Sequence, residues 1–397
     1  MAEAYLVDVV RTPSGRARPE GAYAGIHPVD LLAGVLAEAV ARTGIDPAAV
    51  DDVIGGCVTQ AGEQAMNLTR NAVLAAGFPV SVPATTVDRQ CGSSQQALHF
   101  AAQAVQAGAQ DLVLACGVES MSRAPMWTNW LDRDPYGAGV ARRFPDGLVP
   151  QGVAAEMVVA RYGQRREELD AFAASSHTRA AHARTAGWFD REIVPVKAAA
   201  DEGTTRLVDT DETIRADTTA ERLAELRAAF RTDELAAEHP GLTWAITAGN
   251  SSPLTDGASC AVVASERAMR EHGLTPRARI HATAVVGDDP LTMLLAVLPA
   301  TRRVLDRAGL AISDIDTFEV NEAFACVPLA WQREFDVDPA RLNPAGGAIA
   351  LGHPLGASGI RLMATIVNTL ERQGARYGLQ TMCEAGGLAN ATIVERV

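Results

Sequence analysis

His353 carries the only imidazole in a glycine-rich segment that spans residues 346–359. Glycine permits a positive φ and lets a ligand come close to the backbone. A histidine fixed on such a turn can act as an acid or a base near neutral pH. The simpler alternative is a flexible loop in which the histidine only caps a neighbouring element. A catalytic role therefore requires a partner elsewhere in the chain.

Cys91 is the predicted partner. The β-branched run at residues 85–87 predicts a buried strand, and a helical pattern of apolar residues begins near Gln95. Cys91 would then lie at the N-terminus of a helix, where the helix dipole and free N–H groups favour a thiolate. The alternative is a small buried core thiol. Polar neighbours favour the reactive cysteine: Arg89, Gln90, Ser93 and Ser94.

Three further segments carry polar groups suited to the same chemistry. A second cysteine, Cys383, precedes a run of small residues that ends at Gly387, and its thiol suits acid/base work. Asn321 opens the segment Asn-Glu-Ala-Phe, directly after an apolar strand predicted at 318–320. A Thr-Ala-Gly-Asn-Ser-Ser segment occupies residues 247–252. Each segment is weak support by itself, because short motifs often match by chance.

Taken in order, these five segments resemble the thiolases, which are acetyl-CoA acyltransferases, over nearly all 397 residues. The resemblance implies an α/β protein with the thiolase fold: two duplicated βαβαβαββ halves in a five-layered αβαβα arrangement with an inserted loop domain. The expected N-terminal half is 1–120 plus 246–270. The inserted domain, which would bind coenzyme A, is 121–245, and the C-terminal half is 271–397.

The resemblance also implies a role for each catalytic residue. Cys91 would be the acylated nucleophile and His353 its activator. Cys383 would handle the proton on the acetyl α-carbon. Asn321 would hold a water that forms one oxyanion hole together with His353. The backbone N–H groups of Cys91 and Ala385 would form the other.

Five positions match residues that contact the substrate in relatives. Arg215 and Arg222 would face the nucleotide end of coenzyme A, because the guanidinium fork suits phosphate. Arg222 has an alternative role in ion pairs along an exposed helix. Ser252 would lie near the pantetheine arm. Gln151 stands where relatives often carry Met beside the thioester, and Phe324 belongs to the Asn-Glu-Ala-Phe segment.

The segment around Cys383 departs from the family pattern, which commonly has Ile or Ala followed by Gly. Here Glu384 and Ala385 follow the cysteine. A carboxylate close to the thiol would oppose the thiolate. Alternation of side chains along a strand could instead turn Glu384 away from Cys383. Ala385 would be strained if its backbone needed a positive φ.

Other segments indicate the subfamily. Residues 88–97, 55–60 and 391–397 are most similar to degradative thiolases of actinobacterial type, some of which shorten steroid side chains. This resemblance does not assign an acyl substrate.

A faint internal repeat supports two duplicated halves. Residues 44–53 resemble 309–318 at an offset of 265, and Gly108-Ala109 resembles Gly374-Ala375 at an offset of 266. The same offset carries Cys91 onto Gly356, three residues after His353. The nucleophile and the histidine would then occupy equivalent turns that meet at one cleft. Chance similarity of helix–strand patterns is the alternative.

Composition excludes several classes of protein. A net charge of −13 disfavours nucleic acid and anionic membranes, although local arginines can still bind an anionic ligand. No apolar run has membrane-spanning length, and the N-terminus predicts a strand rather than a signal peptide. Six unpaired Cys fit a reducing cytoplasm. We expect no metal, no permanently bound cofactor, coenzyme A as cosubstrate, and a homodimer or homotetramer.

The predicted activity is thiolytic cleavage of a 3-oxoacyl-CoA through an acyl-cysteine. One alternative is a biosynthetic thiolase that forms acetoacetyl-CoA. A decarboxylating ketoacyl synthase is disfavoured because such enzymes lack the late catalytic Cys. A non-catalytic acyl-CoA or sterol carrier with this fold remains a further alternative, since fold does not fix function.

Overall fold

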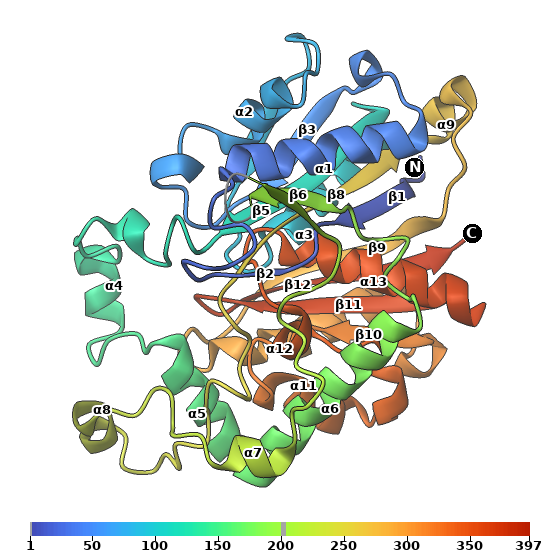
Figure 1. Cartoon of the computed structure of the whole chain (residues 1–397). Coiled ribbons are helices and arrows are strands. Elements are labelled where there is room, and N and C mark those ends of the chain that lie inside the picture. Colours follow the sequence, from blue (N-terminus) through green and yellow to red (C-terminus); the bar gives the residue numbers. More distant parts are fainter. Residues whose placement is uncertain (1, 200–203) are drawn as a thin grey trace.

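A ten-stranded mixed sheet is the framework of the computed structural model, which describes residues 2–199 and 204–397 (Figure 1). Its main path runs β10-β11-β12-β9-β1-β8-β5-β3-β4, and β2 pairs with β8. The strands are β1 (Tyr5–Arg11), β2 (Gly15–Arg16), β3 (Asp52–Gly56), β4 (Ala84–Val87), β5 (Leu112–Ser120), β8 (Thr255–Ala264), β9 (Ala278–Gly287), β10 (Thr317–Val320), β11 (Tyr377–Glu384) and β12 (Leu388–Arg396).

The two ends of this sheet repeat one pattern. In the N-terminal half, β3 pairs in parallel with β4 and β5, and β5 pairs antiparallel with β8. In the C-terminal half, β10 pairs in parallel with β11, which pairs antiparallel with β12. The central strands β5 and β8 are buried along their whole length, as expected for strands covered on both faces.

Equivalent elements keep the spacing predicted from the sequence. Strand β10 begins 265 residues after β3, and β11 begins 265 residues after β5. The helices that follow the loops of Cys91 and His353, α3 (Ser93–Gln106) and α13 (Ser358–Gln373), begin at the same offset. The faint internal repeat therefore corresponds to a repeated arrangement of strands and helices.

The helices form three layers. One lies outside each half of the sheet, and the third lies between the two halves. Helices α1 (Pro28–Thr43) and α2 (Leu68–Ala75) pack outside the N-terminal half. Helices α10 (Val297–Ala308) and α11 (Cys326–Phe335) pack outside the C-terminal half. Helices α3 and α13 share one buried core with β1, β5, β8 and β9, and α13 is buried at nearly every position. A helix that is covered all round belongs in an inner layer, so α3 and α13 form the middle of the structure.

A long insertion between β5 and β8 lies along one side of these layers (Figure 1). Two further short helices, α9 (Glu266–His272) and α12 (Ala348–Leu351), come later in the chain than this insertion. Its elements are α4 (Gly137–Arg143), α5 (Gln151–Tyr162), α6 (Arg166–Thr185), β6 (Val196–Ala199), β7 (Thr205–Val208), α7 (Ala220–Ala224) and α8 (Asp233–Glu238).

The strand predicted at 85–87 is present as β4, but it is only partly buried. Its place at the edge of the sheet is the reason, because one side of an edge strand has no neighbour. The helix after Cys91 begins at Ser93, two residues earlier than its apolar pattern. No helix in the described part of the chain is both long and apolar enough to cross a lipid bilayer.

Candidate active site

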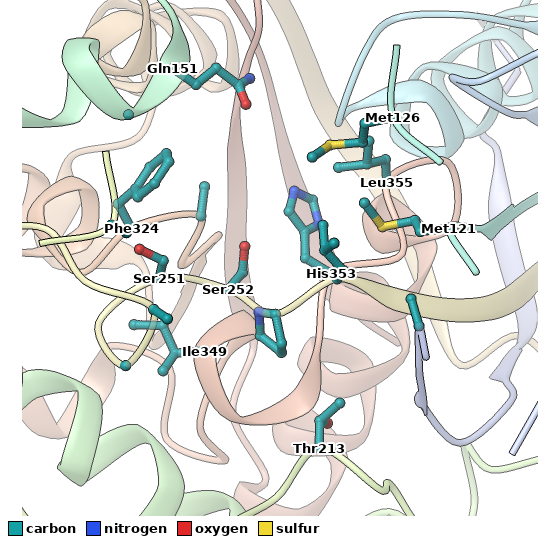
Figure 2. A pocket seen from close by; sticks show the side chains of 18 of the residues that line it. Met121, Met126, Gln151, Thr213, Ser251, Ser252, Phe324, Ile349, His353 and Leu355 are labelled. Atoms are coloured by element: carbon teal, nitrogen blue, oxygen red, sulfur yellow. The ribbon is translucent and has the colours of Figure 1, made fainter. Parts of the chain in front are cut away.

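A cavity of about 520 Å³ gathers most of the predicted site residues. It is bounded by both halves of the sheet framework and by the insertion. In Figure 2, His353 stands between Phe324 and Ser252 on one side and Met126 and Leu355 on the other. The predicted residues on its wall are Cys91, Gln151, Arg215, Ser252, Phe324, His353 and Cys383.

The loop before α3 presents Cys91 to the cavity. Gln90 has a φ of 49°, so the chain turns sharply immediately before the nucleophile. Asp88 accepts the N–H of Gln90 at 2.6 Å. The Ser93 hydroxyl donates to the carbonyl of Gln90 at 2.6 Å and accepts the N–H of Arg89 at 2.9 Å. These bonds satisfy the backbone of a strained turn and fix the direction of the Cys91 side chain.

Cys91 is a thiol, not a thiolate, in this resting structure. Its side chain is 6% exposed. Burial, and after it the charge of Glu384, raises the pKa of Cys91 to about 12, and a backbone N–H opposes this only in part. The helix terminus therefore does not by itself produce the thiolate expected from the sequence, because desolvation outweighs it. A base must remove the proton during the reaction.

His353 lies on the loop between α12 and α13, and a hydrogen bond at Nδ1 fixes the orientation of its ring. Its Nδ1 is 2.6 Å from the hydroxyl of Ser358, which donates to the carbonyl of Pro354 at 2.8 Å. Because that hydroxyl has a single proton, Nδ1 must be the protonated nitrogen, and Nε2 carries the lone pair. Burial, followed by the charge of Arg361, lowers the pKa of His353 to about 3. The imidazole is thus neutral, and its lone pair lies at Nε2.

Asn321 adjoins that base although it does not line the cavity. It follows β10, and its Nδ2 is 3.3 Å from Nε2 of His353. Its Oδ1 is buried and has no hydrogen-bond partner among the described residues. The next residue, Glu322, is bonded to Ser176, Asn343 and the N–H of Ile349, which anchors the loop that holds Asn321.

Cys383 and Glu384 occupy successive positions near the end of β11 and therefore face opposite sides of the sheet. Cys383 reaches the cavity, and burial raises its pKa well above the ordinary value. Glu384 lies against Gly92, on the side of α3, where a Cβ would come within 2.6 Å of its carboxyl carbon. Of the two expectations for Glu384, the structure thus shows the one in which it turns away from Cys383, but towards the loop of Cys91.

Ala385 lies in the turn between β11 and β12, outside the cavity wall. The turn takes its positive φ values at Gly386 and Gly387, of 80° and 76°. Ala385 therefore escapes the strain that a positive φ would impose on it.

Glu119 joins the loop after β3 to the loop of His353, and it was missed in the sequence. From the end of β5, its buried carboxylate accepts the N–H groups of Val58 and Thr59 at 2.9 and 3.0 Å. It also accepts the N–H of Gly356, in the loop of His353, at 2.9 Å. An acidic residue inside an otherwise apolar strand was the available signal, since buried carboxylates need such partners.

Three arginines gather at one end of the cavity. Arg215 lines it together with Arg16 and Arg18, and their charges contribute to a lowered pKa of Arg215, after burial. None of the three guanidinium groups forms an ion pair within residues 2–199 and 204–397. The structure does not bring Arg222 to the cavity. Arg222 pairs instead with Asp217 at the surface, a residue that precedes α7 and is not one of the helix-face partners expected in its alternative role.

The remaining predicted contacts line the wall. Gln151 is the first residue of α5, and Ser252 donates its N–H to the carbonyl of Ala323 at 3.0 Å. Phe324 meets Phe230 edge to face at 5.9 Å between ring centroids. This last contact ties the insertion to the C-terminal half at the cavity.

Comparison with known proteins gives one consistent answer. The thiolase N-terminal domain family matches residues 4–267, and the thiolase C-terminal domain family matches residues 274–396. The steroid 3-ketoacyl-CoA thiolase FadA6 of Mycobacterium tuberculosis is 47% identical, covering 100% of this chain and 95% of that protein. The 3-ketoacyl-CoA thiolase of Cronobacter sakazakii is 44% identical over the full length of both.

Solved structures agree. The acetyl-CoA acetyltransferase of Bacillus anthracis has a TM-score of 0.89 and 38% identity, covering 100% of this chain and 99% of that one. Human mitochondrial 3-ketoacyl-CoA thiolase has a TM-score of 0.89 and 34% identity, with the same coverage. The fold and the resemblance predicted from the sequence are confirmed. This chain belongs to the thiolase family of acyltransferases.

Proposed function

We propose that this thiolase cleaves 3-oxoacyl-CoA with coenzyme A, giving acetyl-CoA and an acyl-CoA shorter by two carbons. The observation that carries the proposal is the meeting of Cys91, His353 and Cys383 on one cavity wall. Two thiols and one neutral imidazole supply a nucleophile, its base and a second proton carrier. The names of the relatives, which include 3-ketoacyl-CoA thiolases, support the same direction of reaction.

The first half-reaction forms an acyl-cysteine. Nε2 of His353 takes the proton of Cys91 while the sulfur attacks the 3-oxo carbon of the substrate. The bond between C2 and C3 then breaks, and the electron pair moves onto C2 of the departing acetyl-CoA. Cys383 donates its proton to that carbon and becomes a thiolate. The acyl group remains on Cys91 as a thioester.

The second half-reaction restores both thiols. The Cys383 thiolate takes the proton of the incoming coenzyme A thiol, whose sulfur attacks the acyl-cysteine. Collapse of the tetrahedral intermediate releases the Cys91 sulfur, which recovers its proton from His353. Negative charge on the carbonyl oxygens would be stabilised by two oxyanion holes. One is a water held by Asn321 with His353, and the other is the backbone N–H pair of Cys91 and Ala385.

Coenzyme A would enter along the insertion. Arg16, Arg18 and Arg215 form a cationic end of the cavity with no carboxylate ion-pair partner among the described residues, and guanidinium groups bind phosphate as a fork. Ser252 and Gln151 would border the pantetheine arm and the thioester. Arg16 and Arg18 replace Arg222 in this proposal, because Arg222 lies outside the cavity.

The acyl chain would occupy the apolar part of the cavity. Its wall there carries Met121, Met126, Leu254, Leu294 and Leu355, beside Phe324. A wall of flexible methionines adapts to irregular apolar shapes. This favours acyl groups larger than acetoacetyl and hence the degradative direction, although the same residues also catalyse the reverse condensation.

One assay tests the activity. Loss of the enolate absorbance of a 3-oxoacyl-CoA on addition of coenzyme A, with release of acetyl-CoA, is the expected result, and Cys91→Ala should abolish it. Mass spectrometry should find an acyl adduct on the Cys91 peptide of the wild type. A protein that binds the acyl-CoA without consuming it would be a carrier, and an unchanged adduct in Cys91→Ala would refute the role of Cys91.

We also propose that the protein is a homodimer or homotetramer that works in the cytoplasm. The edge strand β4 is uncovered, and exposed apolar side chains lie near it in sequence, with Met66 86% and Val80 80% exposed. Such edges are usually covered in stable proteins. All six cysteines are free thiols, as suits a reducing compartment. Sedimentation velocity would give the oligomeric state.

A further inference from the structure

We propose that Glu384 is a positioning residue that keeps Cys91 in the thiol form until substrate is bound. The inference rests on the proposed function of Cys91 as nucleophile and adds the control of its reactivity. Glu384 is part of no step in the mechanism above. It reaches the loop of the nucleophile, at Gly92, from β11, the strand that also carries Cys383, but from the opposite face of that strand.

Contact geometry places the carboxyl group at the beginning of α3. Glu384 is completely buried, and its carboxyl group occupies the space that a side chain at residue 92 would need. Gly92 is the N-cap of α3 and the neighbour of Cys91, with φ −88° and ψ 12°. Since these angles suit any residue, contact with Glu384 rather than backbone conformation is what requires glycine there.

The surroundings of the carboxyl group do not neutralise it with an ion pair. With its amide oriented to satisfy both neighbours, Asn390 of β12 donates to Oε1 at 3.2 Å and accepts the N–H of Gln96 at 3.3 Å. Oε2 has no partner among the described residues. The charged and titratable groups near Glu384 are Asp88, Arg89 and Cys91 from the loop, whereas Cys383, its neighbour on β11, points to the opposite face of the sheet.

Two acidic groups therefore share one buried helix terminus. Burial raises the pKa of Glu384 well above its usual range, and Arg89 opposes this only in part. When the pH rises, the carboxyl group still ionises before the thiol, because a carboxylic acid is the stronger acid. The charge left on Glu384 then opposes a second charge on Cys91, so the pair holds a single negative charge.

This arrangement gives Cys91 a low reactivity in the absence of substrate without preventing its attack on bound substrate. Once Glu384 has ionised, its carboxylate competes with the thiolate for the helix terminus, and Cys91 remains a poor target for alkylation or oxidation until substrate binds. During attack the proton passes directly to His353, and the charge moves on to the substrate oxygen, so a free thiolate is not needed.

Alkylation of the resting enzyme tests the proposal without substrate or turnover. The rate of iodoacetamide addition to Cys91 is followed by peptide mass spectrometry from pH 8 to 10, which lies below the midpoint of a thiol whose pKa is about 12. Glu384→Gln keeps the shape and removes the charge, so the midpoint of the profile should fall by about one pH unit or more. Below the midpoint, this corresponds to about tenfold faster alkylation. Glu384→Asp, which keeps the charge, should stay close to the wild type.

Two further variants complete the test. Glu266→Gln removes an exposed carboxylate on α9, remote from the site, and should leave the profile unchanged. Glu384→Ile supplies an apolar side chain of similar size, and it replaces Glu384→Gln if the buried amide prevents folding. An unchanged alkylation rate across this pH range in a folded Gln or Ile variant would overturn the proposal. Because no acyl-CoA is present, this result is independent of whether the enzyme performs thiolysis.

Discussion

Gly359→Ala should damage catalysis from a position that touches no reacting atom. Gly359 lies in the first turn of α13, where the two inner helices approach most closely. A Cβ on it would lie 2.7 Å from Cβ and 2.8 Å from Cα of Gln95 in α3. The backbone of Gln95 cannot turn away as a flexible side chain would. The two helices must therefore separate.

The size of the effect follows from these distances. The nearest atom to that Cβ would be the backbone nitrogen of Gln95 at 2.3 Å, and ordinary contact begins at 3.4 Å, so the helices have to move apart by about 1.1 Å. Cys91 precedes α3 and His353 precedes α13, and the shift therefore widens the gap between nucleophile and base. A misplacement of about 1 Å can cost on the order of a hundredfold in rate, so we expect acylation to slow by about that factor. Overpacking should also destabilise the fold by about 1–3 kcal/mol.

Rapid-quench measurement of acyl transfer to Cys91, alongside thermal unfolding, would provide both values. Gly34→Ala is the matched control, because Gly34 lies in the middle of α1 with open space around its Cα. That substitution should leave the rate unchanged and stabilise the fold by about 0.5–1 kcal/mol. Acylation at the wild-type rate in Gly359→Ala would refute the idea that this helix contact sets the distance between the catalytic loops.

Three other predictions address individual side chains. His353→Ala should lower turnover about a hundredfold or more through loss of the general base, measured by steady-state kinetics. Because the pKa of His353 is near 3 in the fold and near 6.5 when unfolded, this histidine also destabilises the wild type as pH falls through that interval, and His353→Ala should flatten that part of a denaturation profile. Cys383→Ser should abolish deuterium exchange into acetyl-CoA, seen by NMR, yet spare much of the acylation of Cys91; equal loss of both would contradict the assignment. Arg215→Ala should raise the KM for coenzyme A by tenfold or more, as expected for a charged hydrogen bond, whereas Arg222→Ala should change it little.

Local sequence was sufficient to predict the parts of the site that are formed by one continuous strand, turn and helix. A strand, a sharp turn and a helix around Cys91 could be predicted because each has its own residue pattern. The offset of 265 residues paired the turn of Cys91 with the loop of His353, and the structure begins α3 and α13 at that same offset. Cys383 could be placed only through its resemblance to the family.

The sequence could not predict which side chains from different helices and strands come into contact. Alternation along β11 shows that Cys383 and Glu384 face opposite ways, but not which helix each side meets. Arg16 and Arg18 are about 200 residues from Arg215, and nothing local indicates that they share a cavity. An arginine suits both a surface ion pair and a phosphate contact. The sequence neighbours of Arg222 therefore could not show which of these two roles it has.

The central position of β1 has a consequence for biosynthesis. This strand is made first, yet its partners are β8 and β9, which begin at Thr255 and Ala278. At the usual rate of synthesis, roughly 15–50 s separate β1 from β9 on the ribosome. Contacts so distant along the chain also slow folding itself. During that interval the nascent N-terminal half exposes β1 without its partner strands. We therefore expect chaperones to bind the nascent chain most strongly at this stage.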